Sequence, residues 1–139
     1  MRLIERIFVH CTASSQEWGV KELWDEFKHK GWKNPGYHYV ITKDGAIHQM
    51  LPVEMVSNGV KGYNSTSINI AYVGGIDSKG KVDNRTKEQK DALVTLLKTL
   101  KKKYPNAAIM GHRDIWGADK SKWKKMCPCF NAKEEYKNL

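Results

Sequence analysis

The stretch LIERIFVHC, residues 3–11, decides how this chain is organised. It is rich in Ile, Phe and Val, which predicts a buried β-strand that delivers His10 at its C-terminal end. Because side chains alternate along a strand, His10 and Cys11 are expected to point to opposite faces. We therefore expect Cys11 in the core and His10 at a functional site.

Outward from this strand, the hydrophobic pattern predicts further strands and helices in alternation. Helices are indicated by apolar residues on one face, and strands by short apolar or alternating runs. The expected strands cover residues 3–11, 37–42, 47–50, 68–73 and 107–110, and the expected helices cover 20–30, 87–103 and 131–136. Interleaved strands and helices are typical of an α/β fold, here with a mixed central β-sheet flanked by helices.

The length of 139 residues suits a single domain over residues 1–139. Its 24 Lys and Arg residues outnumber 15 Asp and Glu, and the net charge of +9 favours contact with polyanions such as nucleic acid, anionic lipid or wall polymers. The charge is not accompanied by an RNA-reading aromatic motif or a helix-turn-helix spacing, so a nucleic-acid partner is not favoured. No apolar run is long enough to insert into a membrane.

The N-terminal segment is too short and too charged for the apolar region of a signal peptide. We therefore expect synthesis in the cytoplasm, or a signal already removed. The three cysteines, at positions 11, 127 and 129, do not resemble the framework of a disulfide-stapled secreted domain. Metal or redox chemistry is the better use for them.

His10, His112 and Cys127 are the candidate metal ligands. Two imidazoles and one thiolate, with a fourth position left to water, are the composition of a catalytic zinc centre. Cys127 and Cys129 are closer in sequence than zinc-ligand pairs usually are, so one cysteine is expected to bind rather than two. The alternatives are a redox thiol pair, a packed cysteine, and a strand-end His10 that is hydrogen-bonded to backbone.

Other polar residues have alternative uses that the sequence leaves open. Asp114 is expected either to fix an imidazole tautomer or to pair with Arg113. His38 lies on a predicted strand and is expected to be a hydrogen-bonded core histidine rather than a fourth ligand. Asn64 and Asn69 are expected either to hydrogen-bond a ligand or to cap turns.

Seven short motifs, taken together, carry a resemblance to a known family. They are VHCTA (9–13), GYHY (36–39), DG (44–45), KGYN (61–64), VGGID (73–77), GHRD (111–114) and KMCP (125–128). In this order and with these separations the chain resembles the zinc-dependent N-acetylmuramoyl-L-alanine amidases, whose fold is shared by peptidoglycan recognition proteins. The resemblance covers residues 7 to 130 and looks closest to the short amidase lysozymes of phages.

The resemblance implies a peptidoglycan hydrolase that cleaves the amide bond between N-acetylmuramic acid and L-alanine of the stem peptide by zinc-activated water. It implies that His10, His112 and Cys127 are the ligands of Zn²⁺. It also implies that Tyr37 is a catalytic tyrosine and that Lys125 lies near the scissile carbonyl, where both could stabilise a developing oxyanion. Apart from the resemblance, Tyr37 could fill a hairpin face and Lys125 could be one solvated lysine of a basic run.

The partner that the resemblance implies is peptidoglycan, bound by a monomer that acts on the bacterial wall after release from the cytoplasm. Two alternatives remain open. One is a non-catalytic muropeptide-binding module, against which the retained ligands and Tyr37 argue. The other is an amidase with a second role in binding an RNA polymerase.

The chain departs from the family pattern at three places. Cys129 stands where Gly or Ser is usual, Asn131 stands where Asp is common, and the loop at residues 57–60 lacks a histidine that many relatives have. Cys129 leaves open which sulfur binds zinc and whether a disulfide forms. Because this loop lacks the histidine, the sequence does not identify the peptidoglycan chemotype of the substrate.

Overall fold

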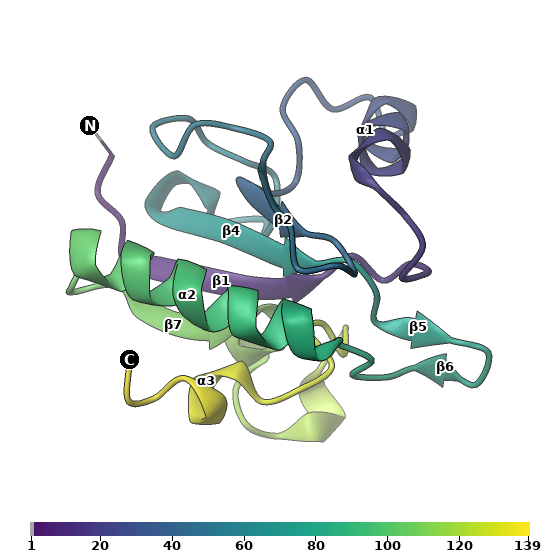
Figure 1. Ribbon diagram of the computed structural model, residues 1–139. Helices are drawn as coiled ribbons and strands as arrows, with labels where there is room; N and C mark the ends of the chain where they lie inside the picture. The colour runs from purple at the N-terminus through teal and green to yellow at the C-terminus, as the bar shows by residue number, and fades with distance from the viewer. Residues whose placement is uncertain (1) are drawn as a thin grey trace.

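The computed structural model describes residues 2–139 and has a five-stranded sheet at its centre (Figure 1). The strands lie in the order β3-β2-β4-β1-β7. Their bounds are Arg6–Cys11 for β1, Tyr39–Ile41 for β2, Ile47–Gln49 for β3, Ser67–Tyr72 for β4 and Ala108–Gly111 for β7. All neighbouring strands pair in parallel except β2 and β3, which are antiparallel. The predicted α/β fold with a mixed sheet is confirmed.

Strand β1 lies inside the sheet, with β4 on one side and β7 on the other. Its residues Ile7, Phe8 and Val9 have no exposed surface. A strand covered on both faces has a continuous apolar run in place of alternation, which explains the composition of this segment. The strand begins at Arg6 and not at Leu3, because Leu3 lies outside the paired segment and is 68% exposed.

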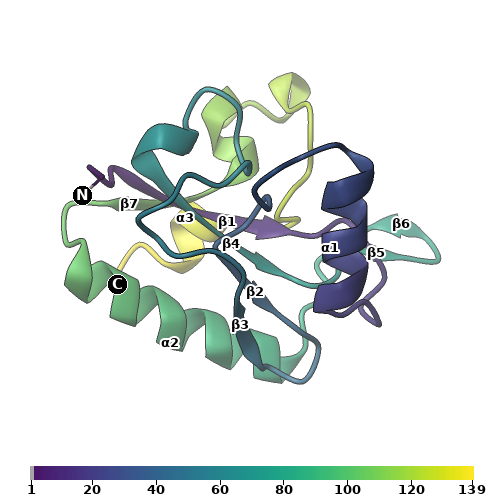
Figure 2. The same ribbon diagram turned by 90° about the horizontal axis from the view of Figure 1, so that it is seen from above.

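Helices cover both faces of the sheet, as predicted (Figure 2). Helix α1, Val20–His29, packs on one face, whereas α2, Lys87–Lys103, and α3, Ala132–Glu135, pack on the other. Cys11 belongs to the larger core, on the α2 face. His10 points to the α1 face, where its ring centroid lies 5.2 Å from that of Tyr37. The expected separation of these neighbouring residues is confirmed.

The two long helices begin and end close to where the sequence predicts. The Thr86 hydroxyl accepts a hydrogen bond from the Gln89 amide at 3.1 Å, and the Gln89 side chain accepts one from the Thr86 amide at 3.0 Å. Gln89 also donates to the carbonyls of Ile41 and Val73, both at 3.0 Å, and so ties α2 to the sheet. After α1, Gly31 adopts a φ of +76°, which favours glycine.

Several short elements differ from the prediction. The strand expected over residues 37–42 is shortened to β2, so Tyr37 lies just before it. Additional elements are the ribbon of β5, Ile76–Asp77, and β6, Gly80–Lys81, and the 3₁₀ helices Asn64–Thr66, His112–Trp116 and Lys120–Lys122. Elements of two to five residues are too short to show a hydrophobic period, so sequence patterning does not reveal them.

Buried polar contacts hold the C-terminal segment against the rest of the fold. The Arg85 side chain is 2% exposed and pairs with Glu135 at 2.8 Å. Its guanidinium carbon lies 3.4 Å from the centroid of the Phe130 ring. The Tyr72 hydroxyl donates to the carbonyl of Pro128 at 2.6 Å. These contacts fix the chain segment that carries the candidate metal-binding cysteine.

Replacing Leu97 with alanine tests the packing of α2 on the sheet. Leu97 is fully buried in the larger core, so Leu97→Ala is expected to lower the free energy of unfolding by about 2–5 kcal/mol. Lys98 is exposed on the same helix, and Lys98→Ala is expected to change that free energy by less than about 0.5 kcal/mol. Urea denaturation followed by circular dichroism measures both. Equal midpoints for the two variants would contradict this packing.

Candidate metal centre and substrate pocket

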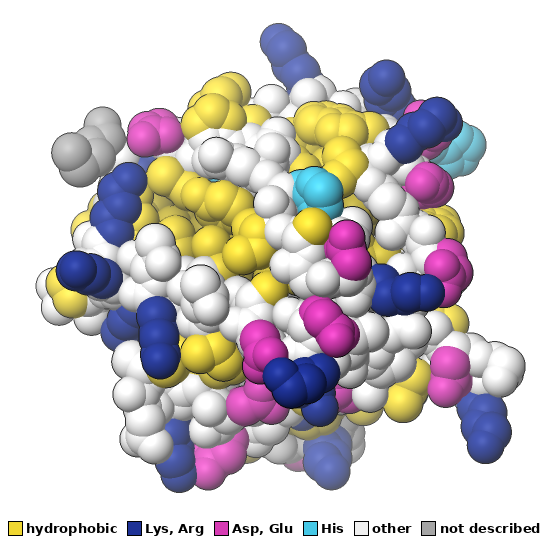
Figure 3. Space-filling model, in the orientation of Figure 1, with side chains coloured by type: hydrophobic (Ala, Val, Ile, Leu, Met, Phe, Trp, Pro, Cys, Tyr) yellow, Lys and Arg dark blue, Asp and Glu magenta, His cyan; other side chains and the backbone are white. Residues whose placement is uncertain are grey.

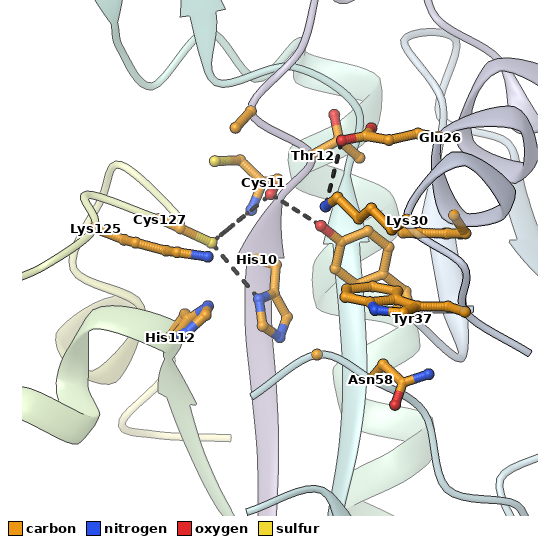
Figure 4. A pocket seen from close by; sticks show the side chains of 15 residues that line it. His10, Cys11, Thr12, Glu26, Lys30, Tyr37, Asn58, His112, Lys125 and Cys127 are labelled. Carbon is orange, nitrogen blue, oxygen red and sulfur yellow. Dashed lines mark hydrogen bonds and ion pairs between the residues drawn. The ribbon is translucent and has the colours of Figure 1, made fainter. Parts of the chain in front are cut away.

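A pocket of about 180 Å³ opens at the C-terminal end of β1, beside α1 (Figure 4). Its lining includes all five residues singled out from the sequence, namely His10, Tyr37, His112, Lys125 and Cys127. The register of the sheet explains part of this convergence. Val9 lies opposite Gly111 in the parallel β1–β7 pair, so the histidine that follows each of them enters the pocket beside the other.

The side chains of His10, His112 and Cys127 form a cluster with the geometry of a metal site. One ligand atom from each lies within 4.8 Å of the others. The Cys127 Sγ is 3.6 Å from the His10 Nδ1. A tetrahedral zinc ion with ordinary Zn–S and Zn–N bonds requires a sulfur–nitrogen separation of about 3.6 Å. The donor types and this distance therefore fit zinc.

The second ring nitrogen of His10 makes a buried hydrogen bond that orients the first. His10 is 1% exposed, and its Nε2 lies 2.8 Å from the Asn69 Oδ1. Because a side-chain amide oxygen is only an acceptor, the proton must be on Nε2. The Nδ1 lone pair then faces Cys127 and the cluster. Such a partner on the far side of a metal-binding histidine fixes its tautomer and ring orientation.

Asn69 is itself held by a chain of buried hydrogen bonds. Its Nδ2 donates to the Ser57 Oγ at 2.7 Å, and its backbone amide donates to the His38 Nδ1 at 3.0 Å. The His38 Nε2 lies 2.7 Å from the carbonyl of Met55, to which it donates. Burial lowers the pKa of His38 to about 4, so it stays neutral. His38 is the core histidine that the sequence predicts.

The loop after Met55 leaves no room for a side chain over Asn69. A Cβ atom on Gly59 would lie 2.3 Å from the Asn69 Cγ, well inside van der Waals contact. Glycine is therefore required where this loop crosses the hydrogen-bonded asparagine. Asn58 and Gly59 also line the pocket, so this loop forms part of its wall.

His112 is placed by the short helix that follows β7. Its ring stacks on that of Trp116, with centroids 5.5 Å apart. The sequence suggested that Asp114 would hold an imidazole or pair with Arg113, but its Oδ2 instead accepts a hydrogen bond from the Gly111 amide at 2.7 Å. Asp114 therefore closes the first turn of the helix, because the exposed amides at a helix start attract a carboxylate.

Both cluster histidines are neutral at pH 7. Burial is the largest cause that lowers the pKa of His10 to about 4. Burial, followed by the nearby His10 ring and the Lys125 ammonium, lowers the pKa of His112 to about 3. Neutral imidazole is the form that binds metals, so the pocket keeps both rings ready for coordination.

The two C-terminal cysteines lie in different surroundings. The Cys127 Sγ belongs to the cluster and accepts a hydrogen bond from the Cys11 amide at 3.3 Å. The Cys129 Sγ lies 3.9 Å from the Cys11 Sγ and 3.8 Å from the Gly75 carbonyl. A cis peptide bond joins Cys127 to Pro128 between them. Only one of the two sulfurs therefore faces the histidines.

Tyr37 and Lys125 flank the cluster. The Tyr37 hydroxyl points toward the carbonyl of Cys11, to which it donates at 3.5 Å. Burial, with a smaller contribution from Cys127, raises the pKa of Tyr37 well above its usual value, so the hydroxyl stays protonated. Lys125 is exposed, and Figure 4 shows its side chain reaching toward the cluster beside Cys127 and His112.

Sequence reasoning missed several residues of this pocket. Asn69 was expected to bind a ligand or cap a turn, and it instead holds His10 from behind. The signal that could have revealed this role is a lone side-chain amide inside the buried run SINIAY, because a buried amide needs a hydrogen-bond partner.

Glu26 of α1 and Lys30 at its C-terminal end form an ion pair of 3.4 Å and line the opposite wall with Trp32. Their spacing of four residues is the signal that both share one face of the helix.

The mixed sheet and the His–His–Cys cluster define the class of this protein as an α/β protein with a candidate metal centre. Residues 1–129 match the family model described as N-acetylmuramoyl-L-alanine amidase. The chain belongs to that family.

Individual relatives agree with this assignment. The endolysin of Klebsiella phage KP32 is 40% identical over 131 residues, which cover 92% of this chain and 82% of that protein. The structure of the N-acetylmuramoyl-L-alanine amidase LysC from Clostridium intestinale superposes with a TM-score of 0.75 and 26% identity, covering 95% of this chain and 80% of the other. Drosophila PGRP-LB, at 18% identity, has a TM-score of 0.75 over 100% of this chain and 82% of its own, and so shares the fold.

Substitution of Asn69 tests its role behind His10. Asn69→Ala removes the acceptor that orients the imidazole, so the affinity of the cluster for a divalent metal ion is expected to fall about 10–100-fold. Competition with a chromophoric chelator measures the affinity. Asn106 is exposed in a turn far along the chain, and Asn106→Ala is the matched control, with an unchanged affinity expected. A folded Asn69→Ala protein with the affinity of the parent would refute the role.

Proposed function

We propose that this chain hydrolyses the amide bond between N-acetylmuramic acid and L-alanine of peptidoglycan, and that His10, His112 and Cys127 hold a zinc ion for this reaction. Peptidoglycan amidase activity follows from membership of the family. The observation that carries the zinc proposal is the 3.6 Å separation of the Cys127 Sγ and the His10 Nδ1, beside a second neutral imidazole. When bound there, zinc supplies Lewis acidity and lowers the pKa of water to about 7.

The remaining chemistry belongs to Tyr37 and Lys125. The protonated Tyr37 hydroxyl can donate a hydrogen bond to the scissile carbonyl, and its ring packs beside His10. The Lys125 ammonium supplies positive charge on the other side of the cluster. Donors placed in advance around a developing oxyanion stabilise the transition state more than the ground state. We assign the two residues this role, and the pocket orients the bond between them.

The proposed substrate is peptidoglycan, bound in the pocket through its stem peptide. Figure 3 shows that Lys and Arg side chains on one face are scattered among Asp and Glu around a hydrophobic area. On that face, the charge pattern does not form the continuous basic strip expected of a nucleic-acid site. No helix within residues 2–139 is long and apolar enough to cross a membrane.

We also propose that one amidase domain spans residues 1–139 and works as a monomer. Support for the extent comes from the segment beyond the family match, where Ala132 of α3 and Tyr136 just after it belong to the larger core. The relatives include phage endolysins, and we propose that this chain likewise acts on the bacterial wall after release. Neither a non-catalytic binding module nor a polymerase-binding role is favoured by the matches.

Chelation of the purified protein tests the proposed reaction. The protein is expected to release new L-alanine amino termini from purified peptidoglycan, and EDTA is expected to abolish the release until zinc is restored. His112→Ala is expected to lower the rate by at least about two orders of magnitude, because it removes a donor from the cluster. Labelling of the amino termini followed by chromatography measures the product. Full activity in the chelated sample would rule out the zinc mechanism.

Paired lysine substitutions test the role of Lys125. Lys125→Ala is expected to lower kcat about 10²–10³-fold with little change in KM, because the ammonium acts on charge that develops in the transition state. The neighbouring Lys124 is also exposed but does not line the pocket, so Lys124→Ala is expected to retain the parent kcat. Steady-state kinetics on a soluble muropeptide compare the two. An equal effect of both substitutions would indicate that only general charge matters.

A further inference from the structure

The cluster uses one of the three cysteines and leaves the other two facing each other. The Cys11 Sγ and the Cys129 Sγ are 3.9 Å apart. Cys11 ends β1 directly after the ligand candidate His10, and Cys129 lies two residues after Cys127. The two thiols therefore lie on two of the three chain segments that deliver the candidate ligands, without belonging to the cluster themselves.

The backbone around the pair is shaped to bring the sulfurs together. Cys129 has a φ of +73°, a left-handed conformation that few residues other than glycine adopt. Gly75 has a φ of +93°, and a Cβ there would lie 2.6 Å from the Cys11 Sγ. The missing side chain at Gly75 leaves space for the sulfurs, because any larger residue would occupy the position next to Cys11.

Cys129 can be reached from outside. A second cavity of about 170 Å³ adjoins the pair, and its lining includes all three cysteines together with Lys81 and Lys125. Cys129 is half-buried, whereas Cys11 is 3% exposed. An incoming reagent therefore meets Cys129 first, with two lysines beside it that attract anions.

We propose that Cys11 and Cys129 are a reversible disulfide-forming pair that is oxidised by low-molecular-weight disulfides. The Cys129 thiol loses its proton to solvent, and its sulfur attacks one sulfur of the small disulfide, which releases one small thiolate. The Cys11 sulfur then displaces the second small thiolate from Cys129 and closes the protein disulfide, again with loss of a proton to solvent. The two protons end on the two small thiols, so the protein is oxidised by two electrons and the reagent is reduced by two.

Closure needs little movement. A disulfide bond is about 2.05 Å long, so the sulfurs have to approach by roughly 1.9 Å from their present separation. Side-chain rotation of Cys129 toward the space beside Gly75 supplies this approach. The Cys127 sulfur is held separately, because it lies 3.6 Å from the His10 Nδ1 and accepts a hydrogen bond from the Cys11 amide at 3.3 Å.

The disulfide would hold the metal centre together by cross-linking two of the segments that carry its ligands, an inference that rests on the proposed zinc site. It links β1 to the segment at residues 127–129 and so fixes the separation of His10 and Cys127. Loss of zinc requires these ligands to move apart. Oxidised protein should therefore release zinc to a chelator several-fold more slowly than reduced protein.

The experiment incubates zinc-loaded protein with oxidised glutathione for hours, since exchange at a thiol of limited access is slow. Free thiols are expected to fall from three to one, the mass to decrease by about 2 Da, and a peptide map to link Cys11 with Cys129. Dithiothreitol should reverse all three changes. A linkage that contains Cys127, a lasting glutathione adduct on the parent protein, or no oxidation at all would overturn the proposal.

Matched variants separate this inference from the proposed function. Cys129→Ser and Cys129→Ala should keep zinc and show no change in zinc release after the same treatment. Cys11→Ala should retain a glutathione adduct on Cys129, because the resolving thiol is missing. If the disulfide forms in a protein that binds no zinc, the thiol pair stands and the zinc proposal fails. If oxidised protein loses zinc faster than reduced protein, the claim that the disulfide stabilises the metal centre is refuted.

Discussion

The alternation of side chains along β1 is the constraint on which the rest of this structure depends. Because β1 is paired on both sides and covered on both faces, it cannot slip by one residue without exchanging its two faces. His10 consequently enters the pocket while Cys11 enters the larger core. The same register sets His112 beside His10, since β7 pairs in parallel with β1. The register of one strand thus positions the two candidate histidine ligands and the Cys11 thiol.

A polar chain buried behind the pocket makes the placement of His10 specific. An unpaired buried imidazole or amide would be costly, so each member of the chain from His10 through Asn69 and Ser57 to His38 needs the next. Within the described residues, no buried side-chain nitrogen or oxygen lacks a hydrogen-bond partner. The network therefore fixes the tautomer of His10 as well as its position. The lone pair of its Nδ1 is directed at the cluster before any metal ion binds.

The larger elements could be predicted from the sequence because their signals are local. Thr86 and Gln89 form a capping box that starts α2, and Gly31 follows α1 with a positive φ. The ligand types could also be predicted, since the chemistry of two histidines and a cysteine narrows the choice of metal. The choice of Cys127 as the ligand agrees with the geometry, which turns Cys129 toward Cys11 instead.

What the sequence by itself determined is therefore the set of chemical groups and the strands and helices that carry them. Only the tertiary structure decided which groups meet. The partnership of His10 with Asn69 joins residues from β1 and β4, and the approach of Cys129 to Cys11 spans almost the whole chain. Local propensity depends on neighbours along the chain, whereas these contacts depend on sheet order and on the course of the C-terminal segment. The physical reason is that hydrogen bonds and thiol contacts act over a few ångströms in space, and the sequence does not record that distance.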